Sequence, residues 1–220
     1  MRLSRILPLL LLPALFRAVP ASAQTTPDPA LQDAIKRYPP LIMGPGLRAT
    51  DGTGPVPTFC GALGGVVEAK GQPATVYRGA DPKEPELCNM SVGGQDVQAW
   101  FGIWVTAWPG ADQGRAALRQ VIGGKTGDVV AFDVVMTPQL SFHDMVRNEG
   151  VEDLPLLGFV YTTLKISHYR EGFNGNNYRS VATVWKDFAT GMIVYATYQH
   201  ISGQPELDDP LDPTAITVPP

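Results

Sequence analysis

Charged residues are scarce in this chain, and those present carry an excess of negative charge. Lys, Arg, Asp and Glu together make up 17% of the 220 residues, whereas 23 residues are glycine and 21 are proline. Because glycine and proline both interrupt helices, this composition disfavours a helical bundle and indicates a domain rich in turns. The acidic balance disfavours binding to nucleic acid or to an anionic membrane surface, since both repel negative charge.

Long apolar runs are absent after the first 23 residues. Residues 1–23 have the pattern of a secretory signal peptide, with arginines at the start, an apolar stretch over residues 6–16, and Ala21-Ser22-Ala23 as the cleavage pattern. The stretch is shorter than the roughly 20 apolar residues that span a bilayer. An uncleaved anchor is the alternative, but we expect cleavage before Gln24. We therefore predict a periplasmic or secreted protein with no integral membrane segment after signal removal.

Cysteine is limited to Cys60 and Cys88. Neither lies in a Cys-x-x-Cys pair or near a histidine, which disfavours a metal site and a reactive thiol. Two cysteines in an exported chain most simply pair with each other. We expect a disulfide that stabilises the fold by roughly 3–4 kcal/mol in the chain-entropy description.

Catalytic motifs are also missing. The chain has no Gly-x-Ser-x-Gly and no His-Glu-x-x-His, and Gly124-Lys125-Thr126 lacks the first glycine of a P-loop and follows a predicted helix instead of a strand. The histidines are His143, His168 and His200. The last two fall on strands about 10 Å apart, too far to share a metal easily. We expect no catalytic residue, no metal and no cofactor.

Two groups of acidic residues leave a hydrolytic function open. Paired carboxylates that cleave glycosides stand about 5–10 Å apart in a cleft. The candidates fall in predicted turns and at strand ends, where solvated acids are ordinary, so we expect them to be surface residues. They are Glu84 and Glu86, and Glu149, Glu152 and Asp153.

The chain divides into four segments by composition. Residues 1–23 are the signal peptide, and residues 24–58 form a short helix followed by a Gly/Pro-rich arm. The arm either lies over the main domain or is a loose linker. Residues 59–202 form a β-domain, and residues 203–220 form an acidic, Pro-rich tail that we expect to be mobile.

Alternating apolar residues and short turns mark the strands of the β-domain. Strands that follow one another through short turns pair antiparallel. We predict a mainly β fold, an antiparallel meander forming a curved sheet or open barrel, with one or two short helices. The expected strands are 66–70, 74–78, 87–92, 95–108, 128–137, 143–154, 159–170, 178–187 and 192–201, with a helix at 112–122.

The turns of residues 143–202 carry a resemblance. A Pro155-x-x-Gly158 turn precedes one strand, and Trp185-x-Asp187-x-x-Thr190-Gly191 joins the last two. This arrangement resembles uncharacterised exported bacterial β-rich envelope domains. The resemblance implies an envelope location and a curved sheet, and it transfers no catalytic residue.

Three tryptophans are the candidate ligand-binding residues. On one strand, Trp100, Trp104 and Trp108 would share a face, because alternate residues point the same way. A flat row of indoles either stacks on sugar rings or packs in the core. Because Phe101 and Ile103 make the opposite face apolar as well, we expect the row to be core.

The last predicted strand is apolar on both faces, with Val194 on one and Ile193 on the other. An antiparallel sheet normally has one face in water, so the helices and arm, a protein partner or an apolar ligand must cover the second. We predict a non-catalytic periplasmic binding or envelope-assembly module for a small apolar ligand or an envelope protein. The alternative is a carbohydrate-binding or carbohydrate-active protein that uses the tryptophan row.

Overall fold

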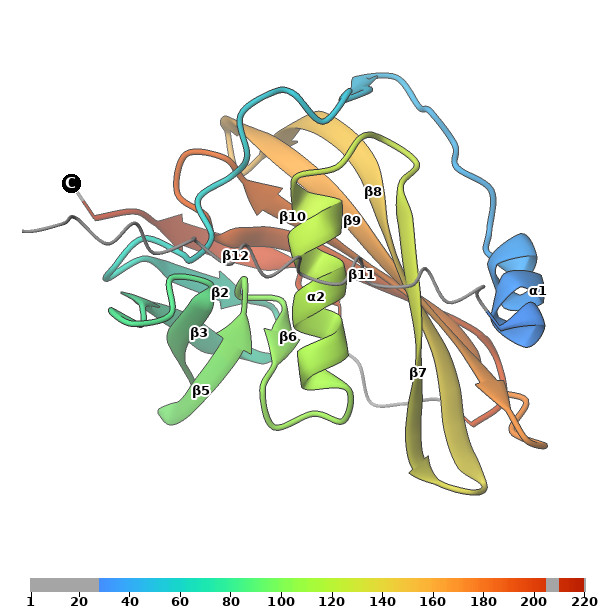
Figure 1. Cartoon of the computed structure of the whole chain (residues 1–220). Helices are drawn as coiled ribbons and strands as arrows, with labels where there is room; N and C mark the ends of the chain where they lie inside the picture. The colour runs from blue at the N-terminus through green and yellow to red at the C-terminus, as the bar shows by residue number, and fades with distance from the viewer. Residues whose placement is uncertain (1–27, 205–209, 220) are drawn as a thin grey trace, which may run out of the picture.

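The structure, a computed structural model, describes residues 28–204 and 210–219. The predicted signal peptide, residues 1–23, lies outside the described residues. Within them the chain forms two antiparallel sheets and two helices, and neither sheet closes into a barrel (Figure 1). The prediction of a mainly β, antiparallel fold with short helices is confirmed. The strands divide between two sheets, each containing a meander of consecutive strands.

The large sheet is built around the longest strand, β8. Strand β7 pairs with its first half and β1 with its second half. The change of partner falls at Gly150, whose φ is 112° and where an added Cβ would lie 2.6 Å from the Arg48 carbonyl oxygen, so this position requires glycine. The strands are β1 (Leu47–Arg48), β7 (Val129–Thr137), β8 (Leu140–Leu156), β9 (Phe159–Phe173), β10 (Arg179–Asp187) and β11 (Ile193–Ser202).

The small sheet has the order β12-β2-β3-β4-β5-β6. Its first strand comes from the predicted tail, because Pro213–Thr217 pairs with β2. The prediction of a mobile tail is therefore wrong for these residues: the Pro-rich composition hid a short run, Ala215-Ile216-Thr217, that suits a strand. The strands are β2 (Val66–Ala69), β3 (Gln72–Ala80), β4 (Leu87–Val92), β5 (Gln95–Trp100), β6 (Trp104–Val105) and β12 (Pro213–Thr217).

The prediction of one strand over residues 95–108 is correct for residues 95–100, which form β5, and wrong for the rest. The chain reverses after Trp100, where Phe101 and Gly102 have φ values of 56° and 70°. Strand β6 then returns antiparallel to β5, with Trp104 opposite Trp100. The apolar alternation of this segment masks the turn, because a non-glycine residue in the left-handed region has no sequence signal of its own.

The two helices cover opposite faces of the large sheet (Figure 1). Helix α1 (Pro29–Arg37) begins at Asp28, whose Oδ1 accepts a hydrogen bond from the Ala30 amide, and it packs on one face of the sheet. Helix α2 (Ala111–Ile122) lies between the sheets, in the core cluster that includes Trp104 and Ile166. None of the helices in the described part of the chain has the length and apolar character to cross a membrane.

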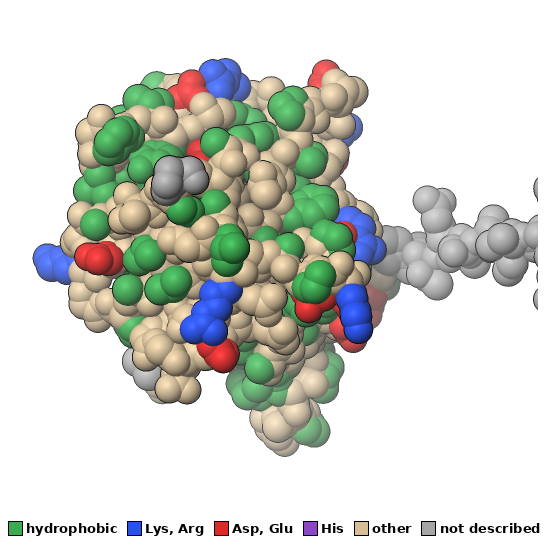
Figure 2. Space-filling model, turned by 90° about the vertical axis from the view of Figure 1, so that its left-hand side faces the viewer, with side chains coloured by type: hydrophobic (Ala, Val, Ile, Leu, Met, Phe, Trp, Pro, Cys, Tyr) green, Lys and Arg blue, Asp and Glu red, His purple; other side chains and the backbone are tan. Residues whose placement is uncertain are grey.

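The β7–β8 hairpin projects from the rest of the molecule. It is the lowest part in Figure 1, and hydrophobic side chains are visible on the corresponding projection in Figure 2. Val135, Met136 and Leu140 are exposed there. Strand pairing, not burial of side chains, therefore holds the end of this hairpin.

Cys60 and Cys88 form the predicted disulfide, which ties the segment before β2 to β4. The same segment contacts the large sheet, since the Ala62 amide donates to the Thr190 carbonyl at 2.8 Å. The disulfide therefore lies at the junction of the two sheets.

A buried lysine spans the same junction. The Lys186 Nζ donates to the Phe101 carbonyl at 3.0 Å and to the Gly191 carbonyl at 2.5 Å, and the side chain has no exposed surface. Burial lowers the pKa of the Lys186 amine to about 7, although the neighbouring Asp187 carboxylate opposes the shift. The amine thus links the β5–β6 turn to the β10–β11 turn. This link costs free energy, because burial removes water from the charged form of the amine.

This lysine predicts a specific pH dependence of stability. A lysine in the unfolded chain titrates near pH 10.4, so between about pH 7 and 9 the unfolded state binds more protons than the native state. The free energy of unfolding should rise by about 2 kcal/mol over this interval, and Lys186→Met should remove the rise. Urea denaturation at several pH values measures both slopes. Parallel pH profiles for the variant and the wild type would contradict this account.

Candidate functional site

The three tryptophans do not form a row. Trp100 and Trp104 face each other across the β5–β6 turn and are buried, whereas Trp108 lies beyond it and is 53% exposed. Trp104 lies flat on α2, where a Cβ at Gly114 would be 2.5 Å from the Trp104 Cδ2. The prediction that these indoles lie in the core is therefore correct for Trp100 and Trp104. Trp108 alone cannot form a flat row that stacks on sugar rings.

A pocket of about 440 Å³ lies between α2, the segment after β6 and the inner face of the large sheet. Trp104, Trp108 and Leu118 line one side, and Met136 of the projecting hairpin also contributes. The volume is in the range that holds small organic ligands. At this pocket, part of the inner face of the large sheet is not covered by another layer of the protein.

Three neighbouring rows of side chains make the sheet side of the pocket. Residues opposite one another on paired strands form each row, and alternate residues of a strand place the rows on one face. The first row is polar, the second is mixed and the third is apolar over the pocket. The rows are Arg170 and Ser180; Val146, His168, Ala182 and Tyr198; and Ile166, Val184 and Ala196.

An ion pair lies beneath the polar end. The Arg170 Nε and Nη2 donate to the two oxygens of Asp144 at 2.8 and 3.0 Å, and the His168 Nε2 lies 3.2 Å from the same Oδ1. Burial alone would raise the pKa of Asp144, but the charge of His168 and the hydrogen bonds from Arg170 outweigh it and lower the pKa to about 2. Asp144 is therefore ionised at neutral pH, and both its oxygens are occupied.

The Trp104 indole N–H, next to the His168 ring at 4.8 Å between centroids, is buried and has no hydrogen-bond partner among the described residues. The Ser180 side chain also lines the pocket and is buried. Because buried polar groups are normally bonded, unpaired ones at a pocket are candidates for ligand contacts.

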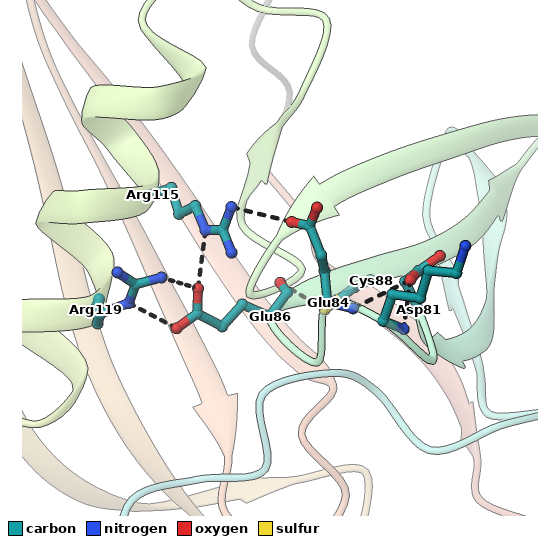
Figure 3. Close-up of polar contacts among 7 residues, drawn as sticks. Asp81, Glu84, Glu86, Cys88, Arg115 and Arg119 are labelled. Carbon is teal, nitrogen blue, oxygen red and sulfur yellow. Dashed lines mark hydrogen bonds and ion pairs between the residues drawn. The ribbon is translucent and has the colours of Figure 1, made fainter.

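The first group of acids from the sequence holds α2 in place (Figure 3). Glu86 accepts hydrogen bonds from Arg119 and Arg115 at 2.7 and 2.9 Å, and Glu84 lies 3.0 Å from Arg115. Hydrogen bonds from these two arginines lower the pKa of Glu86 despite partial burial. The arginines come from α2 and the acids from the loop before β4, so this cluster fastens the helix to the small sheet.

The second group of acids is also paired. Glu149 contacts Arg147 at 2.7 Å, Glu152 accepts from the Trp185 indole at 2.8 Å, and Asp153 accepts from Arg48 at 2.8 Å. No group of three His, Cys, Asp or Glu side chains within residues 28–204 and 210–219 is placed to hold a metal ion. The acids that suggested glycoside hydrolysis therefore serve ion pairs and hydrogen bonds.

Sequence reasoning missed His168 and Ser180 as pocket residues. The signal was present, because Ile166, His168 and Arg170 alternate along one predicted strand, and Ser180 and Ala182 alternate along the next. The sequence alone did not give the register between these strands or the position of α2 over them.

Comparison with known proteins gives no relative: no family model, curated protein or solved structure matches this chain. The resemblance of residues 143–202 to exported envelope domains therefore stays a prediction.

The different surroundings of the tryptophans predict unequal effects of their removal. Trp104→Ala should lower the free energy of unfolding by about 3–5 kcal/mol, because it opens a cavity between α2 and the large sheet. Trp108→Ala, a matched change at an exposed position, should alter it by at most about 0.5 kcal/mol. Chemical denaturation measures both values. Equal effects of the two substitutions would refute the placement of these indoles.

Proposed function

We propose that this protein is a non-catalytic, exported module that binds a small, largely apolar ligand in the pocket between α2 and the large sheet. The observation that carries the proposal is the pocket itself, about 440 Å³ in volume and walled mainly by apolar side chains. Preformed apolar pockets of this size with a few polar groups are the usual form of small-molecule sites. Among the residues that line it, Ala182, Val184 and Ala196 are only partly buried by the rest of the protein.

Export is part of the same proposal and rests on the sequence. The cleavage pattern at Ala21-Ser22-Ala23 and the Cys60–Cys88 disulfide both suit a periplasmic or secreted protein. An envelope protein partner remains the other form of binding module that the sequence suggested. The carbohydrate alternative now rests on Trp108 alone, since Trp100 and Trp104 are buried.

Binding of an uncharged, environment-sensitive dye tests the proposal. N-phenyl-1-naphthylamine should bind the wild-type protein with increased emission, because the pocket excludes water from the dye. Ala182→Phe, which fills the middle of the pocket, should abolish this binding. Ala196→Phe, at the apolar end, is a second filling variant in case the first disturbs the fold.

The control is Ala116→Phe, which adds the same bulk to the exposed side of α2. This variant should bind the dye as the wild type does, and the melting temperature of each variant reports whether it is folded. If folded Ala182→Phe and Ala196→Phe bind the dye with wild-type affinity, the pocket is not the binding site and the proposal fails.

A further inference from the structure

The pocket meets solvent at apolar side chains. Of the described residues that line the pocket, Trp108, Pro109 and Met136 are exposed, whereas the others are buried or half-buried. Arg170 and His168, the lining residues that can carry positive charge, are half-buried and lie against the same buried carboxylate. A molecule that enters the pocket therefore meets the three apolar side chains first.

Two uncharged segments, distant in the sequence, carry these exposed residues. The first, residues 102–111, includes the connection from β6 to α2, and the second, residues 134–142, forms the end of the β7–β8 hairpin. Neither segment contains Asp, Glu, Lys or Arg. The two segments lie side by side, because a Cβ at Gly110 would be 2.5 Å from the Val134 Cγ2. They form one surface that continues into the pocket.

Apolar exposure extends from the pocket over the end of the hairpin. Val135 is 65% exposed and Leu140 is 40% exposed, near Met136 at 47% and Trp108 at 53%. The hairpin end projects from the molecule, and hydrophobic side chains are visible on it in Figure 2. We call these four residues the rim patch. Gathered apolar side chains on a surface are typical of an interaction site.

A lipid bilayer fits the rim patch better than a protein partner does. The four side chains are each 40–65% exposed, so together they offer much less area than the roughly 800 Å² per partner that a stable protein interface buries. A projecting hairpin can enter the head-group region without a complementary surface, and Trp is enriched at membrane–water interfaces. Because the patch residues carry no charge, they match zwitterionic lipid and have no basic group to attract anionic lipid.

We infer that the rim patch docks this protein on the surface of a zwitterionic lipid bilayer, and that the ligand enters the pocket from the bilayer beside Trp108 and Met136. The ligand class is then an apolar molecule that partitions into lipid. The second part of this inference rests on the proposed function of the pocket. Docking itself needs no ligand, so the two parts can be tested separately.

Phosphatidylcholine vesicles with brominated acyl chains test docking. Trp100, Trp104 and Trp185 are buried, whereas Trp108 is exposed. The vesicles should therefore quench the Trp108 part of the emission of the mature protein, which lacks residues 1–23. Trp108→Phe keeps an aromatic ring, so this variant should lose the quenching while it still floats with the vesicles. High salt should leave wild-type binding unchanged, because no ion pair with the lipid contributes.

Substitutions in the rim patch but outside the pocket separate docking from ligand binding. Val135→Asp and Leu140→Asp should each lower the partition coefficient onto phosphatidylcholine vesicles by about tenfold, because each removes apolar contact and adds a charge. Neither residue lines the pocket, so both variants should bind N-phenyl-1-naphthylamine in solution as the wild type does. The matched control is Phe159→Asp, at the exposed end of the β8–β9 hairpin and also outside the pocket lining, which should keep vesicle binding.

The rate of dye transfer tests entry from the bilayer. N-phenyl-1-naphthylamine loaded into phosphatidylcholine vesicles should reach the pocket more slowly in Leu140→Asp than in the wild type or Phe159→Asp, measured by energy transfer from the tryptophans to the dye. Equal rates for the three proteins would overturn entry from the bilayer. The melting temperature of each variant shows that it is folded, and Val135→Asp replaces Leu140→Asp if the latter is not.

Three results would overturn docking by the rim patch. The wild type does not bind phosphatidylcholine vesicles, its binding requires anionic lipid and is lost at high salt, or Phe159→Asp abolishes binding that the folded patch variants keep. If one of these occurs while the dye still binds in solution, the inference fails and the proposed function stands. If the vesicles bind as expected but the dye does not bind the wild type, the proposed function fails and entry of a ligand fails with it.

Discussion

The position of α2 between the two sheets is the constraint on which the rest of the structure depends. Trp104 lies flat on this helix at Gly114, and any side chain larger than hydrogen there would collide with the indole. A glycine inside a helix costs roughly 1 kcal/mol relative to alanine, so the close approach has a stability cost that packing must offset. Arg115 and Arg119 fasten the other side of the helix to Glu86 (Figure 3). Held in this way, α2 covers part of the large sheet and leaves the adjoining part as the wall of the pocket.

The polar groups inside the molecule serve two different purposes. Lys186 and the Cys60–Cys88 disulfide join the sheets, and each of these groups has its bonding partners. The amine donates hydrogen bonds to two carbonyls, and the cysteines bond to each other. The Trp104 indole N–H at the pocket, in contrast, has no partner in the part of the chain that the structure describes. Because a buried polar group without a hydrogen bond costs free energy, this contrast supports binding as the role of the pocket.

Local structure could be predicted from the sequence, but the packing of segments that are distant in the chain could not. Periodicity and turn residues identified both helices and the strands of the large sheet except β1, and the export pattern made a disulfide the simplest state of the two cysteines. The reversal at Phe101 was missed because an aromatic residue with positive φ has no local signal. The same turn decides that Trp100 and Trp104 are buried while Trp108 is exposed. The pocket could not be predicted, since it requires the register of β9 and β10 and the packing of α2 above them.

Recovery of a bound molecule tests the central claim most directly. Protein purified without detergent can be weighed intact by native mass spectrometry and again after denaturation. We predict that the wild type carries a small, largely apolar molecule that is released on denaturation and is absent from folded Ala182→Phe. If the wild type and this variant carry the same molecule, or if added N-phenyl-1-naphthylamine fails to form a complex with the empty wild-type protein, the pocket is not a ligand site and the account is contradicted.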